Sequence, residues 1–553
     1  MCYKTININT IKANIIFLLI FLINSNSSLK SQDFDFEWNQ VFERSIFSTG
    51  KALTTDSEGD VITTGSFKDT LFFDSDTIIP EKLNSYFIIK TDDYGETKWI
   101  KIIESDNYIR IYSLAVDEND NIYFAGYFNG NWQDGNIMLQ SRGGSDAFIM
   151  SIDKTGNFRW AKSAGSLDTD FQWFVVADGK GGVYTVGKHF LEDFFVSENI
   201  TLNRVSPYII KYTTEGDVVW ASNVGGDLHS VTGKPYINND IIYIPGASLG
   251  KILLDTLIYS DNIAAMIMEF GIDGHYIDTK LYGANECDNC GINSVVTDPF
   301  NNLYLFGNFD GNITIKDTTL TSIGDGSNFF IVKLNEQGNI NWINQFSGNS
   351  KRLMNYFNNR IFLDIDVENH DTIFFSDTII NTQNDKTLLV ILDRLGRIDE
   401  IINGQSTFGV EIEDICLNKK DNKLNLYFTG IFGKDLHFPG MELFGHNNST
   451  YYLNKYSVEI PEIPDTLEYS DNFLIFPNPT SGFFNIKFKD IQPETITLDI
   501  IDVQGKQLFS QKNNCGNVNM VENINISNLQ NGLYFLEIRY ANKIIVKKII
   551  LSR

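Results

Sequence analysis

The stretch that decides the fold is residues 110–162, RIYSLAVDENDNIYFAGYFNGNWQDGNIMLQSRGGSDAFIMSIDKTGNFRWAK. It contains four runs rich in β-branched and aromatic residues, which Asp, Asn and Gly separate. Such runs between turn residues predict β-strands, and helical periodicity of useful length is absent here. The second and third runs are separated by a longer insert containing Ile137-Met138-Leu139. The four predicted strands are residues 111–116, 122–128, 147–152 and 158–161.

This four-strand unit recurs about every 61 residues along the chain. Trp38, Trp99, Trp160, Trp220 and Trp342 are spaced by 61, 61, 60 and 122 residues, so one Trp is missing near Tyr282. Two sets of glycines follow the same period. The first set closes turns and comprises Gly95, Gly156, Gly216, Gly274, Gly338 and Gly396. The second set lies in predicted strands and comprises Gly65, Gly126, Gly187, Gly246, Gly307 and Gly430.

Four strands per unit, repeated radially, are typical of a β-propeller blade. The spacing predicts an all-β fold with a seven-bladed β-propeller over residues 32–457. The strand at 36–42 has no preceding partners, and the last unit, ending at 451–456, has no fourth strand, so we expect the first to complete the last. Blades 4 and 6 are expected to be degenerate, with Ser376 replacing the strand glycine in blade 6. An open β-solenoid or a two-part sandwich remains an alternative.

The units resemble secreted bacterial β-propeller repeats with the pattern G-x-F-x-G, then S-x-G-x-x-D-x-F, then D-x-x-G-N-x-x-W-A-K. Residues 126–130, 141–148 and 156–162 carry the best local match. The resemblance implies the propeller fold and no particular activity.

The N-terminus has the organisation of a secretory signal peptide. Lys4 and Lys12 precede an uncharged apolar run at 15–23, which is too short to span a bilayer, and a small polar segment follows. We expect residues 1–31 to be removed, with cleavage between Ser31 and Gln32. An uncleaved N-terminal anchor is the alternative.

A second domain is expected at the C-terminus. Residues 458–470 contain alternating proline and acidic residues and are interpreted as a linker. Residues 471–553 hold nine Lys/Arg and seven Asp/Glu, whereas the whole chain has a net charge of −26. Turn residues at 479–482, 504–505 and 531–532 between alternating strands predict a small Ig-like β-sandwich.

This tail resembles the C-terminal sorting domain of the type IX secretion system of Bacteroidota. Four blocks carry the match: residues 475–482, 498–506, 526–534 and 543–550. The resemblance implies contact of residues 471–553 with the secretion machinery, an extracellular or cell-surface location after passage through the periplasm, and either release or attachment to surface lipopolysaccharide. The acidic balance argues against nucleic acid as a partner.

Candidate chemistry is sparse in the sequence. The cysteines are Cys2, Cys287, Cys290, Cys416 and Cys515. The C-x-x-C pair at 287 and 290 is interpreted as a local loop disulfide, with free thiols and metal or redox chemistry as alternatives. His437 and His446 are a weak candidate for a ligand pair, and Asp74-Ser75-Asp76 is a solvated turn or a weak calcium site. Asp56, Asp117, Asp178 and Asp298 are interpreted as turn residues.

We therefore assign no catalytic, cofactor-binding or metal residue, and we expect no cofactor. Two functional hypotheses follow. The first is a cell-surface or secreted binding or adhesion module, whose inserts and channel mouth contact an unknown glycan or protein ligand. The second is an extracellular hydrolase or lyase acting on polysaccharide, which needs carboxylates, Tyr or His to converge at the channel mouth.

Overall fold

The computed structural model describes residues 34–551, apart from segment 460–472 and shorter gaps of one to six residues. Every regular element in the described residues is a β-strand, and none of these residues belongs to a helix long and apolar enough to cross a membrane. Contacts divide the chain into two compact units, with the division between Glu459 and Ile460. The predicted signal peptide at 1–31 and most of the predicted linker lie outside the described residues.

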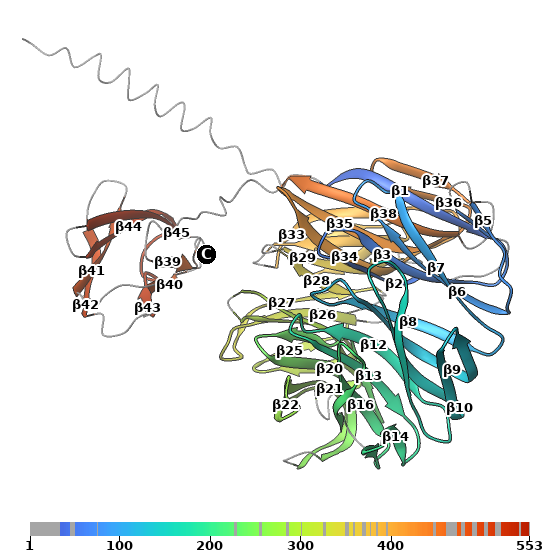
Figure 1. The fold of residues 1–553 in the computed structure, drawn as a ribbon. Coiled ribbons are helices and arrows are strands. Elements are labelled where there is room, and N and C mark those ends of the chain that lie inside the picture. The colour runs from blue at the N-terminus through green and yellow to red at the C-terminus, as the bar shows by residue number, and fades with distance from the viewer. Residues whose placement is uncertain are drawn as a thin grey trace, which may run out of the picture. The chain divides into compact units, whose positions relative to one another are not determined.

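The first unit is built from four-stranded antiparallel sheets that follow one another along the chain (Figure 1). The first three sheets are β2 (Gly50–Thr55), β3 (Val61–Phe67), β6 (Asn84–Thr91) and β7 (Thr97–Ser105); β8 (Ile109–Val116), β9 (Ile122–Asp134), β10 (Ile137–Ile152) and β11 (Phe158–Ala164); and β12 (Phe171–Ala177), β13 (Gly182–His189), β16 (Ser206–Thr213) and β17 (Val218–Asn223).

Three further sheets continue the series. They are β18 (His229–Thr232) with β19 (Tyr236–Asn238), β20 (Ile241–Leu253), β21 (Leu257–Gly271) and β22 (Tyr276–Tyr282); β23 (Cys287–Thr297), β24 (Leu303–Ile315), β26 (Asn328–Leu334) and β27 (Ile340–Ser347); and β28 (Met354–Phe357), β29 (Arg360–Asp366), β32 (Thr387–Leu392) and β33 (Ile398–Gly404). The strands predicted at 111–116, 122–128, 147–152 and 158–161 all form. The predicted insert extends β9 and β10 into a longer hairpin.

The seventh sheet is assembled from both ends of the repeat region. Strands β34 (Val410–Lys420), β35 (Lys423–Phe432) and β38 (Thr450–Glu459) are completed by β1 (Asp35–Arg44). Asp35 pairs with Ser457 and Phe42 with Tyr451, so the blue strand β1 lies beside the orange strand β38 in Figure 1. The N-terminal strand therefore completes the last sheet, as the sequence predicts.

The periodic Trp residues join neighbouring sheets. Each lies on the fourth strand of one sheet, and in four of them the indole N–H donates to a carbonyl in the turn between the third and fourth strands of the next. The periodic turn glycine, with a positive φ near 90° at Gly95, Gly156, Gly216 and Gly274, leaves room for the indole ring. The bonds run from Trp38 to Asp93 O (2.9 Å), from Trp99 to Lys154 O (3.0 Å), from Trp160 to Thr214 O (2.9 Å) and from Trp220 to Ile272 O (3.3 Å).

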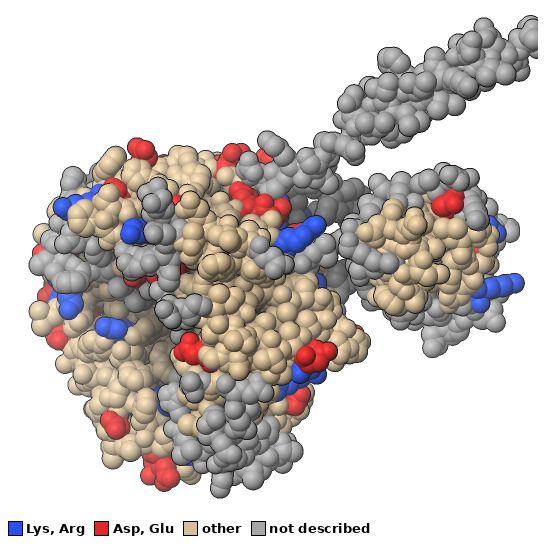
Figure 2. Space-filling model, turned by 180° about the vertical axis from the view of Figure 1, so that it is seen from behind, with Lys and Arg blue, Asp and Glu red and all other residues tan. Residues whose placement is uncertain are grey.

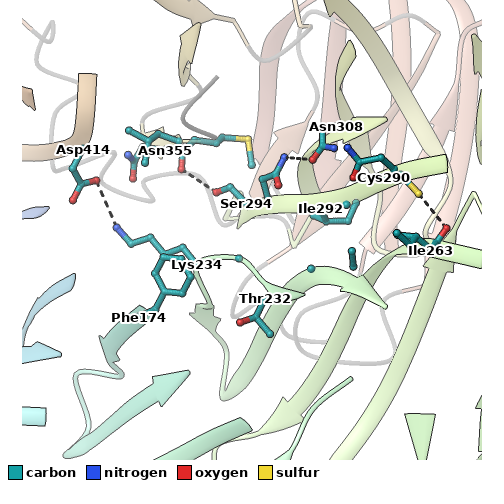
Figure 3. A pocket seen from close by; sticks show the side chains of 18 residues that line it. Phe174, Thr232, Lys234, Ile263, Cys290, Ile292, Ser294, Asn308, Asn355 and Asp414 are labelled. Atoms are coloured by element: carbon teal, nitrogen blue, oxygen red, sulfur yellow. Dashed lines mark hydrogen bonds and ion pairs between the residues drawn. The ribbon is translucent and has the colours of Figure 1, made fainter. Parts of the chain in front are cut away.

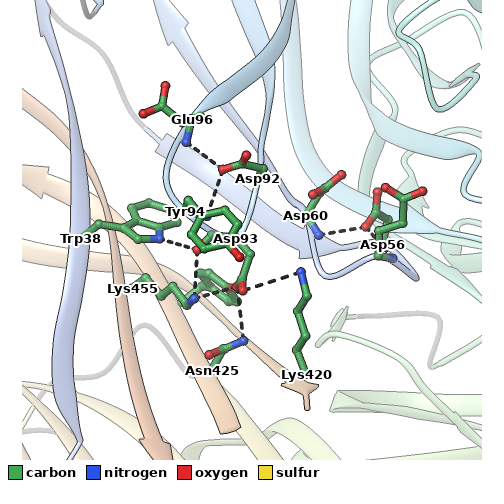
Figure 4. A network of polar contacts seen from close by, with 12 residues as sticks. Trp38, Asp56, Asp60, Asp92, Asp93, Tyr94, Glu96, Lys420, Asn425 and Lys455 are labelled. Atoms are coloured by element: carbon green, nitrogen blue, oxygen red, sulfur yellow. Dashed lines mark hydrogen bonds and ion pairs between the residues drawn. The ribbon is translucent and has the colours of Figure 1, made fainter. Parts of the chain in front are cut away.

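At the junction of the first and last sheets, a polar network adds to this contact (Figure 4). Asp93 Oδ1 accepts hydrogen bonds from Lys455 Nζ (2.6 Å) and Tyr427 Oη (3.0 Å). Lys420 Nζ lies 3.6 Å from Asp93 Oδ2. Lys154, Thr214 and Ile272 occupy the position of Asp93 in three other sheets, so those three junctions lack this carboxylate.

The periodic strand glycines allow a close approach of the first strand within the same sheet. The register shifts opposite or next to them, between Ile111 and Ser113 for example, and pushes a carbonyl toward the second strand. A Cβ on Gly126 would lie 1.7 Å from the Arg110 carbonyl oxygen, and a Cβ on Gly430 would lie 1.8 Å from that of Glu411. These contacts leave no room for a side chain.

Two positions expected in the degenerate blades are wrong. The missing Trp corresponds to Asp278, which pairs with Glu269 as Trp220 pairs with Lys211, whereas Tyr282 pairs with Ala265. The missing strand glycine corresponds to Ile365, not to Ser376, which follows β30 (Thr372–Phe375) in a turn. Here β28 and β29 pair without a register shift, so nothing demands glycine and the repeat shortens.

Several inserts cover the outer edge of the preceding sheet. Hairpin β4 (Leu71–Phe73) and β5 (Asp76–Ile78) pairs with β1, and hairpin β30 with β31 (Thr378–Asn381) pairs with β27. Single bridges join Gly165 to Phe195 and Gln405 to His437 in the same way. The strands involved are β14 (Phe194–Ser197), β15 (Ile200–Leu202), β36 (Asp435–Phe438) and β37 (Met441–Phe444), while β25 (Thr318–Thr321) pairs with its own β24. Inserts thus satisfy exposed sheet edges.

The second unit is a two-sheet β-sandwich. One sheet contains β39 (Phe473–Phe476), β40 (Phe483–Phe488) and β43 (Val521–Asn525), and the other contains β42 (Gln507–Asn514), β41 (Thr495–Asp502), β44 (Gly532–Tyr540) and β45 (Lys543–Leu551). Its buried core lies between the sheets and includes Phe484, Ile486, Leu498, Leu536 and Ile549. The predicted turn at 504–505 lies outside the described residues.

Candidate functional site

The cavity that stands out in the first unit has a volume of about 290 Å³ and lies among the first strands of successive sheets (Figure 3). Its walls come mainly from the first strands β12, β18, β23, β28 and β34, with residues of β20, β21 and β24. Residues representing these first strands are Phe174, Thr232, Ser294, Asn355 and Asp414. Five successive sheets contribute lining residues, so the repeat architecture itself creates the site.

Neutral amides dominate the polar lining. Asn289, Asn293, Asn308 and Asn355 all line the cavity, together with the apolar side chains of Phe174, Ile263, Ile292 and Met354. Asn293 Nδ2 donates to Asn308 Oδ1 at 3.0 Å, and Asn355 Nδ2 donates to the Ile415 carbonyl at 2.9 Å. Apolar walls with a few placed polar groups are typical of small-molecule sites.

Lys234 is the cation among the described lining residues. Its Nζ lies 3.9 Å from Asp414 Oδ1, and its side chain is 42% exposed whereas that of Asp414 is 8% exposed. Screening by water makes such an ion pair weak, so the ammonium can turn toward a bound group at little cost.

Asp414 has a structural role in this cavity. Its Oδ2 accepts a hydrogen bond from the Leu53 N–H at 2.9 Å, which joins the last sheet to the first. Ser113 with Val175, Ser294 with Met354, and Asn355 with Ile415 make corresponding links between other neighbouring first strands. Side chains thus replace backbone pairing where adjacent first strands are not paired, and Asp414 is one member of this series.

Cys287 and Cys290 form a disulfide, in agreement with the favoured interpretation. The pair lies at the start of β23 and not in a loop, because the register shifts between the two cysteines and accommodates one extra residue. Both side chains are buried, and Cys290 lines the cavity. The bond therefore fixes part of the cavity wall.

The four aspartates interpreted as turn residues do close turns. Asp117 Oδ1 accepts the backbone N–H groups of Asn119 and Asn121, both at 2.9 Å. Asp56, Asp178 and Asp298 accept the N–H four residues later in the same way. These carboxylates therefore stabilise the turns that connect the first strand of a sheet to the second.

The proposed ligand pair at His437 and His446 gains no support. His437 lies on β36 beside Asp435 and Glu442, while His446 lies outside the described residues. Asp74 and Ser75 of the weak calcium site also lie outside them. The part of the chain that is described contains no group of three His, Cys, Asp or Glu side chains placed to hold a metal ion.

Two buried carboxyl groups were not singled out by the sequence. Burial raises the pKa of Asp146 to about 7 and that of Asp170 to about 6. Asp146 Oδ2 accepts the Arg142 N–H at 2.9 Å, and Asp170 Oδ2 accepts the Ser166 N–H at 2.5 Å. Asp146 is the Asp of the S-x-G-x-x-D-x-F pattern, so this motif residue holds the preceding insert in place.

Charge is dispersed over the face shown in Figure 2. On the face shown in Figure 2, Lys and Arg side chains lie singly among Asp and Glu, with uncharged residues between them. With this distribution and the net charge of −26, that face has no basic patch that could bind a polyanion.

Comparison with known proteins gives a family for the second unit. Residues 474–552 match the secretion system C-terminal sorting domain. The chain is also 22% identical over 402 residues to an uncharacterised WD repeat-containing protein of Acanthamoeba polyphaga mimivirus, covering 56% of this chain. The match spans 28% of that relative's length.

Similarities to solved structures are low. The hemagglutinin-neuraminidase ectodomain of parainfluenza virus 5 aligns with a TM-score of 0.34 and 8% identity, over 82% of this chain and 96% of that one. A DUF4221 family member from Bacteroides vulgatus aligns with a TM-score of 0.30 and 12% identity, over 64% and 99%. An apocarotenoid oxygenase chimera aligns with a TM-score of 0.30 and 10% identity, over 51% and 57%.

The sorting-domain match implies interaction with the type IX secretion machinery and secretion to the outer surface or the extracellular space. The sheets of the first unit and the WD-repeat relative agree with a propeller-like repeat fold. The chain is therefore a secreted all-β protein that joins a β-propeller to a C-terminal sorting domain of the type IX secretion system.

Proposed function

We propose that this protein is a non-catalytic binding or adhesion module that the type IX system delivers to the cell surface or the medium. The cavity among the first strands is the observation that supports a binding role. It is concave, lined by apolar groups and four amides, and held rigid by links between the strands that form it. The ligand is a surface glycan or an extracellular protein.

The channel mouth is a better contact surface than the inserts as a group. Several inserts form the outer edges of neighbouring sheets, so their backbones are already engaged. The lining side chains of the cavity retain accessible amide and ammonium groups.

A hydrolase or lyase acting on polysaccharide is the alternative. Glycoside hydrolysis ordinarily needs two carboxyl groups that flank the scissile bond. Of the described residues that line the cavity, Asp414 alone has a carboxyl group, and a backbone N–H already engages it. The cavity geometry therefore favours binding over this chemistry.

The delivery route includes processing at both ends. Residues 1–31 direct export to the periplasm, residues 32–457 form the functional propeller, and residues 458–470 link it to the sorting domain at 471–553. The mature protein is then released or attached to lipopolysaccharide.

Cell fractionation with mass spectrometry tests this route. The full chain is expected outside the cell without its tail, whereas a variant lacking residues 471–553 is expected to stay in the periplasm. If both variants are found in the same compartment, the tail is not the sorting signal. A screen of purified protein against surface glycans and extracellular proteins tests the binding role, which fails if no ligand is found.

A further inference from the structure

Six aromatic side chains gather where the second and third sheets meet, at the strand ends opposite the Asp117 and Asp178 turns. We name them the aromatic ledge. They come from β8, β9 and β12, from the segment before β8 and from the residue after β13. The ledge comprises Tyr108, Tyr112, Tyr127, Phe171, Trp173 and Phe190.

The rings form a continuous series. Tyr112 stacks on Tyr127 with a centroid separation of 5.6 Å, and Tyr127 meets Phe171 edge-on at 4.7 Å. Phe171 in turn stacks on Trp173 at 6.2 Å and meets Phe190 at 5.7 Å. Tyr127 is buried beneath the series, whereas Phe190 is 40% exposed and Tyr112 and Trp173 are half-buried. The ledge therefore presents ring surface to solvent on a rigid base.

Hydrogen-bonding groups border these rings. Tyr127 Oη lies 3.3 Å from Tyr108 Oη and 3.4 Å from Tyr112 Oη. The exposed Arg110 donates from Nη1 to Tyr112 Oη at 3.1 Å. Burial raises the pKa of Tyr127, so its hydroxyl stays neutral and keeps both donor and acceptor capacity.

The strand registers relate the ledge to the cavity. Tyr112 is the residue skipped in the register shift of β8, and Tyr127 follows the strand glycine. The same two positions in the fifth sheet hold Asn293 and Asn308, which line the cavity and bond to each other. Trp173 holds the first of these positions in the third sheet, and the next residue, Phe174, lines the cavity. Aromatic and amide pairs thus occupy equivalent positions around the same mouth.

We propose that the aromatic ledge binds a neutral pyranose-containing saccharide, with sugar C–H faces stacked on Tyr112 and Trp173. The tyrosine hydroxyls and Arg110 donate to and accept from sugar hydroxyls, and the amides of Asn293 and Asn308 receive the part of the chain that enters the cavity. Rigid aromatic surface edged with hydrogen-bonding groups suits a ligand that is apolar on its ring faces and hydroxylated at its edges. The net charge of −26 disfavours acidic glycans. This proposal rests on the binding function and names its ligand class.

Titration of the full chain with neutral gluco-, manno-, galacto- and xylo-oligosaccharides tests it, by calorimetry and tryptophan fluorescence. At least one series is expected to bind, and Trp173→Ala and Tyr112→Ala are each expected to weaken it about tenfold. Tyr112→Phe keeps the ring and is expected to lose less. Phe444→Ala, at a 68% exposed ring on another insert, is the matched control and should leave affinity unchanged.

Far-UV circular dichroism and thermal melting establish that each variant folds. If Trp173→Ala does not fold, Trp173→Phe is expected to abolish the ligand-induced change in emission while keeping most of the affinity. Saccharide binding that is unchanged in all ledge variants would overturn the proposal that the ledge is the binding site, but would not contradict the binding function. Binding only to acidic glycans, or only to a defined protein, would have the same consequence. Failure of every ligand class would overturn both proposals.

Discussion

The ammonium group of Lys455, on β38, lies 2.6 Å from Oδ1 of Asp93, a residue 362 positions earlier in the chain. The side chains are only 5% and 18% exposed. Burial opposes ionisation of Asp93, but the hydrogen bond from Lys455 holds its pKa below the ordinary value. This ion pair links β38, at the end of the repeat region, to the first sheet, which follows β1 directly along the chain.

Replacing Lys455 with Met is expected to lower the free energy of unfolding by about 2–3 kcal/mol, because Asp93 then stays partly buried without its nearest cation. Urea denaturation measures the change. Lys180→Met removes the exposed pair with Asp240 and should cost less than about 0.5 kcal/mol. Equal effects from both variants would contradict a special role for the Asp93 junction.

Gly216 is expected to be intolerant of a side chain because its Cβ would lie 2.7 Å from the Trp160 ring. Gly179 has a similar positive φ, and a Cβ there would meet no described atom within 4 Å. Ala at Gly179 should therefore cost about 1 kcal/mol from backbone strain alone, whereas Ala at Gly216 should cost about 1–3 kcal/mol more. Chemical denaturation of both variants isolates the contribution of the Trp contact, and similar losses would refute it.

Gly126→Ala is expected to disrupt the second sheet, since the new Cβ would lie 1.7 Å from a backbone oxygen that cannot move without breaking the strand. The expected loss exceeds about 3 kcal/mol. Gly291, on a first strand, has its nearest neighbour 3.5 Å from the ideal Cβ and is the matched control, with an expected change below about 1 kcal/mol. Thermal melting followed by circular dichroism compares the two.

Asp146 makes stability depend on pH in an unusual direction. Its folded pKa of about 7 exceeds the unfolded value of about 4, so the native state holds an extra proton between those values. The free energy of unfolding should fall as pH rises through this window. Asp146→Asn should flatten that dependence and stabilise the protein at pH 8 by about 1–3 kcal/mol.

Asp153→Asn is the control with the opposite sign. Burial opposes ionisation of Asp153, but the Thr155 hydroxyl and the N–H groups of Asn157 and Thr155 lower its pKa. Its contribution is present above about pH 4 and is lost as pH falls below that value. Denaturation curves from pH 2 to pH 8 should separate the two variants, and parallel profiles would contradict the assignment.

The repeat fold was predictable because its packing requires particular single residues, Trp and Gly, at fixed positions of each unit. The Trp of one sheet must lie under the turn glycine of the next, so both appear with the same period. The strand glycine, by contrast, is required only where the first strand shifts register. Where the shift is missing, Ile365 replaces glycine and the period shortens, so the position predicted at Ser376 was wrong.

The site was less accessible to sequence reasoning. Nothing in the sequence around Asn293 and Asn308 marks them as site residues, because only the strand register places them beside the cavity. Tyr112 and Tyr127 occupy the same positions of their unit, 181 residues earlier. Aligning the units on the strand glycine would have brought these pairs together. The Asp93–Lys455 pair gave no such signal, because nothing local in either segment predicts the partner.

The last sheet also acts as a check that the chain is whole. Its fourth strand, β1, is synthesised first, and its third strand, β38, is synthesised last. Asp35 can therefore pair with Ser457 only after more than 400 intervening residues have been synthesised. Pairing over such a separation forms late, since the chain entropy of joining distant segments must be overcome first. A truncated product would keep an unpaired strand edge and a gap beside Asp93, and proteases and chaperones act on such surfaces. Only a complete repeat region can pair β1 with β38. This pairing therefore distinguishes full-length molecules from fragments.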